Sequence, residues 1–537
     1  MLYPQKKFIF KTLILAGLIT GFFSNETTAQ SAIPPRPKLI LGIMVEGLNE
    51  DNISMLRPLF TKDGFNRFYN DGVILTNVDF GSKISNASAA AIVYTGASPV
   101  TNGIFANEKF DRRTNRISHI LRDTTYIGNT STQILSPKAI TVSTLGDEVR
   151  LDASGTGWVY SIAPDASQAI ISAGHAGSNA YWIDDKTGLW TTTAYYKDIP
   201  APMSNRNFRR SLPTMLDTLT WKPLLKPELY PYIPEYKIKY PFRYNFTKKD
   251  SDRFIHFKQS GRVNDEITDL ACEFLKNMDF GNRGTIDMLN LTFNVNPYPF
   301  PINADNRMEL MDSYLRLDND LSILINEAEK KVGKENLLVF ISGIPARRQS
   351  VRDDDKWGIP SGDFSPKKAV SLLNMYLMAL HGNGNWVTGY FDRNFYLNVD
   401  LIKDKQLDLS SIRKEAAEFL TRMSGVSSAI TVEDIIAGRA GDNPTALKRN
   451  SSIKHSGDIT IEIIPGWSVV DDINLQADKT PQVFRENISP STVMFYSPLL
   501  EPQIIETRID ARVIAPTVAR LAKIRAPNAA ELPPLRL

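Results

Sequence analysis

Near-continuous apolar runs of strand length recur along the chain and are separated by segments with helical periodicity. The first run covers residues 38–45 ("KLILGIMV"), and similar runs occupy residues 157–163, 286–293, 336–342 and 458–464. Apolar runs without alternation are typical of strands that are covered on both faces of a parallel sheet. The pattern therefore predicts several buried strands that lie side by side.

The longest helical pattern covers residues 306–333. Tyr314, Leu317, Leu321 and Leu324 fall on one face of it, and Gly333 is a typical helix stop. Strands that alternate with such helices indicate an α/β sandwich, with a mostly parallel central sheet between layers of helices.

Two stretches interrupt this alternation. Residues 197–255 are rich in Pro and Tyr and predict an irregular cap excursion, whose aromatic rings either bind a glycan or a protein or simply pack against the main domain. Residues 345–455 predict an inserted α+β cap lobe, with helices near 367–382 and 410–423 around a strand-rich segment at 385–399. We expect the main sheet to resume at Asp458.

The amino-terminal segment has the pattern of a secretory signal peptide. Lys6, Lys7 and Lys11 precede an apolar stretch at residues 12–23, and small residues follow around 29–32. We expect residues 1–30 to be removed and residues 31–537 to form one domain, exported to the periplasm or secreted. No other run approaches the ~18 apolar residues of a membrane span, so we expect no transmembrane segment in the mature chain.

Composition and charge narrow the class of protein. With 42% hydrophobic and 23% charged residues, the chain is an ordinary globular one. Its formal charge of +3 falls to about +1 without the signal segment, which argues against nucleic acid as a partner, because binding a phosphate backbone needs a basic stripe. Cys272 is the single cysteine, so no intrachain disulfide can form.

Residue patterns for common hydrolytic chemistry are missing. The chain has five histidines, which are far apart in sequence and make no i, i+4 pair: His119, His175, His256, His381 and His455. No G-x-S-x-G elbow or Walker loop occurs in a strand-turn-helix context. Ser85, Asn86 and Ser88 stand at the start of a helix rich in small residues, which is either an anion site or an ordinary capped helix.

Several motifs together identify a family resemblance. They are "YTGASPVTNGIFANEKFD", "AGHAGSNAYWIDDKTG", "DSYLRLDNDL", "SGDITIEIIPGW" and "IDARVIAPTVARLAKIRAPNAA". With these the chain resembles the alkaline phosphatase superfamily, most closely the bacterial PafA-type phosphatases, from about residue 38 to residue 535. The resemblance implies an alkaline-phosphatase-like sandwich. It also implies two zinc ions held by Asp and His at strand ends, a Thr or Ser nucleophile, and an Asn with a Lys/Arg pair on the phosphoryl oxygens.

Most of the implied site residues are replaced in this sequence. The first metal ligand, an Asp in the family, corresponds to Glu46, whose extra methylene shifts the carboxylate by about 1.5 Å. The nucleophile position falls on Asn86, whose amide cannot attack phosphorus. The remaining metal-ligand positions fall on Pro297, Pro301, Ile344, Pro345 and Pro481, and the Lys/Arg pair falls on Asp165 and Ser167. Asn107 is the one phosphate-contacting position that is retained.

These replacements predict an exported pseudo-phosphatase that binds an envelope protein or another ligand and needs no cofactor. The metals and the nucleophile supply most of the barrier lowering in phosphoryl transfer, and nearly all of their positions are changed together. The alternative is a phosphoric or sulfuric ester hydrolase with a rebuilt site, which would use zinc in another arrangement with Glu46, Ser85 or Ser88, and Asn107.

Overall fold

The computed structural model describes residues 36–537, except for residues 82–83, 198, 302–303, 346–357, 359–361, 440–443, 452–455, 470–471, 473–481 and 484–489. The predicted signal peptide, residues 1–30, lies outside the described residues. Among the helices that are described, none combines the length and the apolar character that crossing a membrane requires.

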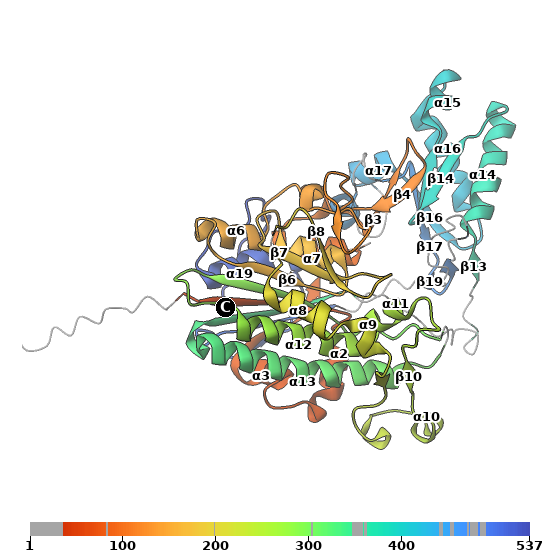
Figure 1. Ribbon diagram of the computed structural model, residues 1–537. Coiled ribbons are helices and arrows are strands. Elements are labelled where there is room, and N and C mark those ends of the chain that lie inside the picture. Colours follow the sequence, from red (N-terminus) through yellow and green to blue (C-terminus); the bar gives the residue numbers. More distant parts are fainter. Residues whose placement is uncertain are drawn as a thin grey trace, which may run out of the picture. The chain divides into compact units, whose positions relative to one another are not determined.

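A large mixed sheet organises the described chain (Figure 1). Its strand order is β21 (Gln503–Ile505), β2 (Gly72–Asp79), β20 (Ser491–Tyr496), β12 (Leu337–Ile344), β1 (Leu39–Glu46), β11 (Asp287–Asn294), β6 (Val159–Ile162), β7 (Asn179–Ile183), β8 (Trp190–Thr193) and β5 (Gly128–Asn129), with β22 (Ile509–Asp510) beside β2. The central strands β12, β1, β11, β6 and β7 are parallel, whereas β20 and β8 pair antiparallel with their neighbours. The predicted α/β sandwich with a mostly parallel central sheet is confirmed.

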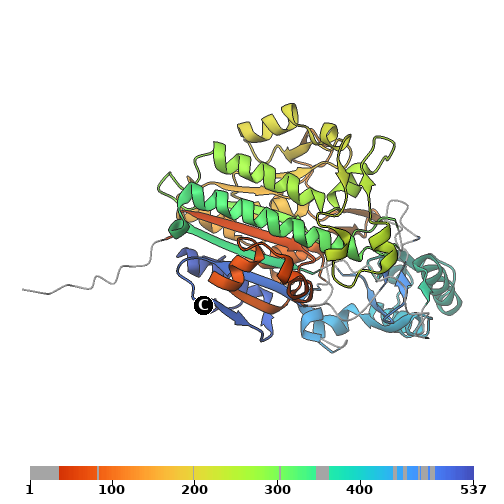
Figure 2. The same cartoon turned by 90° about the horizontal axis from the view of Figure 1, so that it is seen from below.

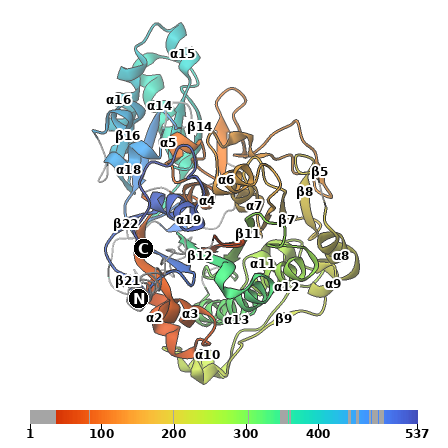
Figure 3. The ribbon, with the colours of Figure 1, turned by 90° about the vertical axis from the view of Figure 1, so that its left-hand side faces the viewer.

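Helices cover both faces of this sheet, as Figure 3 shows. On one face lie α2 (Glu50–Leu56), α3 (Phe65–Asp71), α12 (Arg262–Asn277) and α13 (Arg307–Val332); the other face carries α4 (Asn86–Thr95), α6 (Leu145–Asp152), α7 (Ala166–Ala173) and α19 (Ile514–Ala522). Alternate residues of β1 enter the two cores, with Leu41 and Ile43 on the α13 side and Ile40 and Met44 on the α4 side. Burial on both faces explains why this strand reads as one continuous apolar run.

The longest predicted helix is confirmed as α13, which covers Arg307–Val332 and is followed by Gly333, where φ is +86°. Figure 2 shows α12 and α13, in green, lying along the strands that they cover. Tyr314, Leu317 and Leu321 of α13 are buried in the core below the sheet. The hydrophobic spacing therefore predicted both the helix and its buried face.

The inserted lobe has its own sheet and core. It contains α14 (Pro366–His381), α15 (Val399–Asp404), α16 (Leu409–Thr421), α17 (Val432–Ala437) and α18 (Pro444–Arg449), with β14 (Val387–Phe391), β15 (Asn394–Leu397), β16 (Val426–Thr431) and β17 (Ile459–Ile463). A smaller sheet joins β13 (Asp363–Phe364), β18 (Ser468–Val469) and β19 (Gln482–Val483). The predicted return to the main sheet at Asp458 is wrong, because β17 pairs with β15 and β16 and the main sheet resumes at β20. An apolar run identifies a buried strand but not the sheet to which it belongs.

The Pro- and Tyr-rich excursion consists of short elements. These are α8 (Ala201–Arg209), α9 (Leu212–Leu216), β9 (Thr220–Trp221), α10 (Glu235–Lys239), β10 (Tyr244–Asn245) and α11 (Arg253–Lys258). Its aromatic rings divide into two groups. Tyr230 and Phe242 are buried in the main core, whereas Tyr232 and Tyr240 are exposed. Packing against the main domain thus accounts for part of the excursion, and a binding role for the exposed rings stays a prediction.

Candidate functional site

The strand ends that carry the predicted site lie side by side at one edge of the main sheet. Because β1 is parallel to β11 and to β12, Glu46 at the end of β1 is in register with Asn294 on one side and with Ile344 on the other. The carboxyl ends of parallel strands form the usual ligand-binding edge of an open α/β sheet. We call this region, with the first turns of α4 and α7, the strand-end site.

Glu46 is held by two carboxamides. Gln168 Nε2, from α7, donates a hydrogen bond to Glu46 Oε1 at 2.6 Å, and Asn296 Nδ2 donates to Oε2 at 3.1 Å. Gly47 permits the second contact, since its φ is +85° and a Cβ at that position would lie 2.8 Å from Asn296 Oδ1. Glu46 is only 9% exposed, so this buried carboxylate is satisfied by neutral protein donors.

The other predicted metal-ligand positions offer no ligand atoms. Ile344 is fully buried and belongs to the core on the α4 side of the sheet. Pro297 is half-buried and Pro301 is exposed, as expected for residues of the connection between β11 and α13. Pro345 follows β12 directly, and Pro481 lies outside the described residues. Neither an isoleucine nor a proline side chain can coordinate a metal ion.

Side chains of the same segment cap the N-terminus of α4 by hydrogen bonds. Ser85 is the N-cap: its Oγ accepts from Ser88 N at 3.2 Å, and its backbone N donates to Ser88 Oγ at 2.8 Å, which completes a capping box. Asn86 is the first helical residue, and the retained Asn107 accepts from Ala87 N through Oδ1 at 2.9 Å. Of the two interpretations of this segment, an anion site or an ordinary capped helix, the hydrogen bonds favour the capped helix.

His119 and Ser167 join a hairpin to the first turn of α7. The hairpin is formed by β3 (Glu108–Asp111) and β4 (Arg116–His119). Leu121 N donates to His119 Nδ1 at 3.1 Å, so the neutral ring carries its proton on Nε2, which lies 3.1 Å from Ser167 Oγ. Burial lowers the pKa of His119 to about 4, and Asp165 offsets only part of that effect. The ring is therefore neutral near pH 7 and acts as a hydrogen-bond donor.

Lys258 supplies the only cation that we find beside the replaced Lys/Arg pair in the described chain. Its Nζ lies 2.5 Å from Asp165 Oδ1 and also contacts Asp185. Burial on its own would lower the pKa of Lys258, but the attraction of the two carboxylates outweighs it and raises the pKa above the ordinary value. Two carboxylates thus surround one lysine where the family places two cations, and this environment disfavours a phosphate anion.

The predicted zinc centre does not fit these residues. A structural or catalytic zinc ion needs three or four Cys, His, Asp or Glu ligands in tetrahedral geometry. In the part of the chain that the structure describes, no group of three or more such residues is placed to hold a metal ion. At the strand-end site Glu46 is the single carboxylate at a family ligand position, and carboxamides occupy both of its oxygens.

The sequence predicted that Glu46, Asn86, Asn107 and the proline and isoleucine positions belong to the site. It did not predict four further residues of the strand-end site: Gln168, Asn296, His119 and Lys258. Two of these carried a usable signal. Gln168 and Asn296 follow the predicted strands at 157–163 and 286–293 by a few residues, where polar groups reach the sheet edge. His119 and Lys258 come from a hairpin and a short helix whose position no local pattern reveals.

Comparison with known proteins places this geometry in a family. A family model described as type I phosphodiesterase / nucleotide pyrophosphatase matches residues 40–486. The chain is 26% identical over 551 residues to alkaline phosphatase PafA of Elizabethkingia meningoseptica, covering 99% of this chain and 98% of the relative. It is 26% identical over 454 residues to alkaline phosphatase PhoV of Synechococcus elongatus, covering 80% and 81% of the two chains.

The fold agrees with this sequence similarity. The crystal structure of wild-type PafA matches with a TM-score of 0.81 and 25% identity, over 93% of this chain and 98% of the PafA chain. The family model spans most of the sequence, including the strands β1, β11 and β12 that carry the strand-end site. The chain therefore belongs to the type I phosphodiesterase / nucleotide pyrophosphatase family.

Proposed function

We propose that this protein is an exported, catalytically inactive member of its family, a pseudo-phosphatase that acts by binding a protein or another ligand in the periplasm or outside the cell. The observation that carries the proposal is the state of Glu46, whose two oxygens accept from Gln168 and Asn296. A carboxylate that is satisfied by carboxamides has no need of a metal. The signal-peptide pattern of residues 1–30 supports export.

The surrounding residues support the loss of phosphoryl transfer. That reaction depends on positioned metal ions, an activated nucleophile and cations that stabilise the charge of the transition state. Asn86 offers an amide at the nucleophile position, and the hydroxyls of Ser85 and Ser88 bond to each other at 3.0 Å. Asp165 stands where a cation is needed and is itself paired with Lys258.

The named activity of the relatives favours a second candidate, a phosphoric or sulfuric ester hydrolase with a rebuilt, zinc-dependent site. Such a site would have to use Glu46, Ser85 or Ser88, and Asn107. Each of these side chains already has a hydrogen-bond partner within the protein, so a rebuilt site would first have to break the capping box or the carboxamide contacts.

Metal content and turnover separate the two candidates. We expect elemental mass spectrometry to find far less than one zinc ion per chain in the purified mature protein. We also expect aryl phosphate and aryl sulfate to be hydrolysed no faster with the protein than in buffer alone. Glu46→Ala tests the site, and Glu501→Ala, an exposed glutamate, is the matched control. Stoichiometric zinc with turnover that is lost in Glu46→Ala but kept in Glu501→Ala would overturn the proposal.

The envelope role needs its own test. Cell fractionation of the tagged full-length chain should find the mature form, shortened by about the predicted signal peptide, outside the cytoplasm. Affinity capture from envelope extract should then enrich a defined protein or small molecule over an unrelated exported bait. A cytoplasmic full-length chain, or capture that enriches nothing over the unrelated bait, would contradict this part of the proposal.

A further inference from the structure

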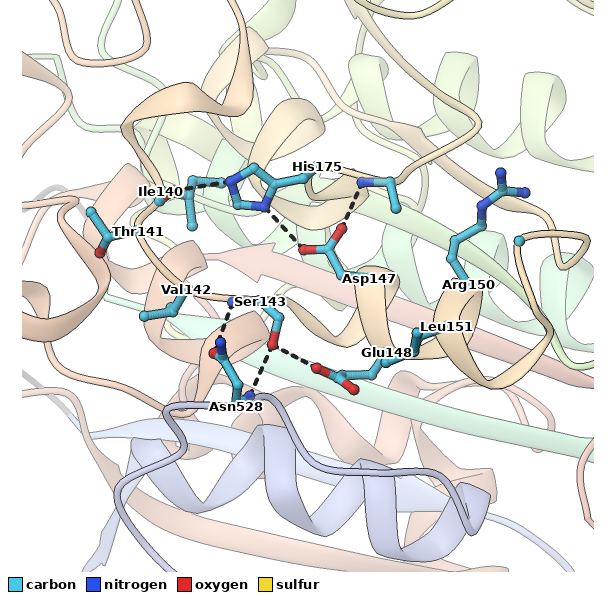
Figure 4. A pocket seen from close by; sticks show the side chains of 12 residues that line it. Ile140, Thr141, Val142, Ser143, Asp147, Glu148, Arg150, Leu151, His175 and Asn528 are labelled. Atoms are coloured by element: carbon cyan, nitrogen blue, oxygen red, sulfur yellow. Dashed lines mark hydrogen bonds and ion pairs between the residues drawn. The ribbon is translucent and has the colours of Figure 1, made fainter.

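A cavity lies at the opposite edge of the main sheet from the strand-end site. Figure 4 shows the side chains that line it. The volume of the cavity is about 560 Å³, within the range of small-molecule sites. One wall is α6 with the loop before it, and a second is the turn at residues 174–177. That turn follows α7 and leads into β7, where Ser178 N donates to Val159 O at the amino end of β6. The cavity is thus separate from the site that the family resemblance identifies.

Most polar groups of the wall are already satisfied. Asp147 accepts from Thr144 N, Thr144 Oγ1, His175 Nδ1 and Ala176 N at 2.7 to 3.2 Å. His175 also lies 3.0 Å from Ile140 O through Nε2, so both of its ring nitrogens are engaged. The Asp147 carboxylate balances the charge of the protonated ring.

Glu148 and Arg150 are the exceptions, because Glu148 Oε2 and Arg150 Nε are both buried without a hydrogen-bond partner among the described residues. Only 3% of Glu148 is exposed, and its Oε1 accepts a single hydrogen bond, from Ser143 Oγ at 2.6 Å. Its Oε2 is buried and accepts no hydrogen bond from any described residue, and no cation of the described chain pairs with the side chain. Arg150, two residues further along α6, directs its guanidinium to Gly157 O instead.

A buried carboxylate without a cation is unusual, because desolvation of the charge costs several kcal/mol unless a partner offsets it. The start of α6 contributes only about 0.3–1 kcal/mol through the helix dipole. Glu46 meets this cost with two neutral donors, whereas Glu148 has one, so a further donor at Oε2 would stabilise the carboxylate, and a positively charged donor would do so most. The rest of the wall is mixed: Val142 and Leu151 offer apolar surface to a hydrocarbon body, whereas Thr141, Arg150 and Asn528 are polar.

We propose that this cavity binds a small organic cation, a primary amine with an apolar body, whose ammonium group pairs with Glu148. An organic cation fits better than a metal ion, because the four donors on Asp147 and the two acceptors on His175 leave Glu148 as the one carboxylate with an unused oxygen. Gly155, an exposed residue at the cavity wall, has no atom within 4 Å of the position that a Cβ would occupy, so the cavity is open on this side.

Calorimetric titration of the full mature protein with benzylamine, at neutral pH where the amine is protonated, tests the proposal. We expect benzylamine to bind at least about tenfold more tightly than benzyl alcohol, which has the same body but no charge. Glu148→Gln should lower the affinity for benzylamine by a factor of about ten or more. The matched control Glu501→Gln, which changes an exposed glutamate, should bind as the parent does.

Val142→Phe is a second variant that keeps the Glu148 carboxylate and fills the cavity, so it tests the site if Glu148→Gln does not fold. This variant should also lower the affinity for benzylamine. Equal binding of benzylamine and benzyl alcohol, no binding of either, or full binding by Glu148→Gln or Val142→Phe would overturn the proposal. Displacement of benzylamine by calcium or zinc chloride at equimolar concentration would overturn it in favour of a metal site.

Discussion

Glu46 shows how a buried carboxylate at the end of β1 is held by carboxamides of the protein. Its carboxylate reaches the carboxamides of Gln168 and Asn296, which come from α7 and from the segment after β11. The length of the glutamate side chain is what lets its carboxylate reach both donors. A return to the family residue should therefore disturb the site rather than restore it.

We predict that Glu46→Asp lowers the free energy of unfolding by about 1–3 kcal/mol, because the carboxylate withdraws and leaves two buried amide donors unsatisfied. The variant should bind no more zinc than the parent, since the other family ligand positions stay Pro and Ile. Urea denaturation and elemental analysis check the two parts, with Glu501→Asp as control. One zinc ion per Glu46→Asp chain would contradict the expectation.

Because of His119, the stability of the folded protein is expected to depend on pH in the acid range. The folded pKa of His119 is about 4 because the ring is buried, whereas an unfolded chain has a histidine pKa of about 6.5. As pH falls, the unfolded chain takes up this proton first, so the stability that depends on neutral His119 is complete above pH ~6.5 and is lost as pH falls from ~6.5 towards 4.

We predict that this residue contributes a loss of about 2 kcal/mol between pH ~7.5 and pH ~4.5, and that His119→Gln removes that part of the loss. Urea denaturation at both pH values measures it. His381→Gln, in the lobe, controls for the general effect of removing a histidine. An unchanged acid dependence in His119→Gln would show that the ring does not stay neutral in the folded protein.

At the residue scale, the family resemblance could be assigned to particular positions because each one lies at a recognisable strand end or helix start, and the loss of site residues at these positions stays a prediction. Ile344 lies at the end of β12, and Asn86 is the first residue of α4. It did not identify the two carboxamides that bind Glu46. Whether Gln168 and Asn296 meet at Glu46 depends on the side-by-side placement of β1, β11 and α7, and no local pattern encodes that placement.

Among the elements, α13 packs against the main sheet and also binds the Pro- and Tyr-rich excursion through hydrogen bonds. Asp312, which is fully buried on α13, accepts from Trp221 Nε1, Leu224 N and Tyr230 OH at 2.6 to 2.7 Å. Arg316, one turn later, donates to the same carboxylate at 2.7 Å. One carboxylate thus fixes β9 and the segment that follows it to the main domain.

We predict that Asp312→Ala destabilises the protein by about 3–5 kcal/mol, because it removes the closest carboxylate from the buried Arg316 and the acceptor from Trp221 Nε1 and Tyr230 OH. Limited proteolysis should cut the segment between β9 and β10 faster than in the parent. Asp305→Ala, which removes the acceptor of the exposed Tyr236, should change stability by less than about 1 kcal/mol. Equal cleavage of the parent and Asp312→Ala would refute the role of Asp312.

The elements also show where sequence reasoning stops. The strand type of β1, β11 and β12 and the full length of α13 followed from hydrophobic spacing, because each buries a continuous or helical apolar surface. The assignment of β17 to the main sheet failed, since its run "ITIEI" would suit either sheet. Pairing partners depend on contacts between distant segments, which the pattern of one strand does not contain.

For the molecule as a whole, the family fold is combined with a strand-end site in which carboxylates outnumber cations. The family fold is retained over nearly the full chain. At the strand-end site, however, Lys258 pairs with Asp165 and Asp185, and Glu46 is bound by the neutral Gln168, so three carboxylates accompany one cation. An oxyanion would meet repulsion at an edge that in phosphoryl-transfer enzymes attracts it.

We predict that inorganic phosphate does not bind to the protein. A ligand present at ~100 times its Kd stabilises the folded state by about 2.7 kcal/mol, so a site with Kd of ~0.1 mM would raise the unfolding temperature clearly in ~10 mM phosphate. Phosphate and sulfate should instead give the same small rise, since both are excluded from protein surfaces. Thermal unfolding in each salt, at matched ionic strength, measures the difference. A phosphate-specific rise that Asn107→Ala abolishes would show that the retained asparagine still serves an oxyanion site, and that the change of charge at Asp165 did not remove it.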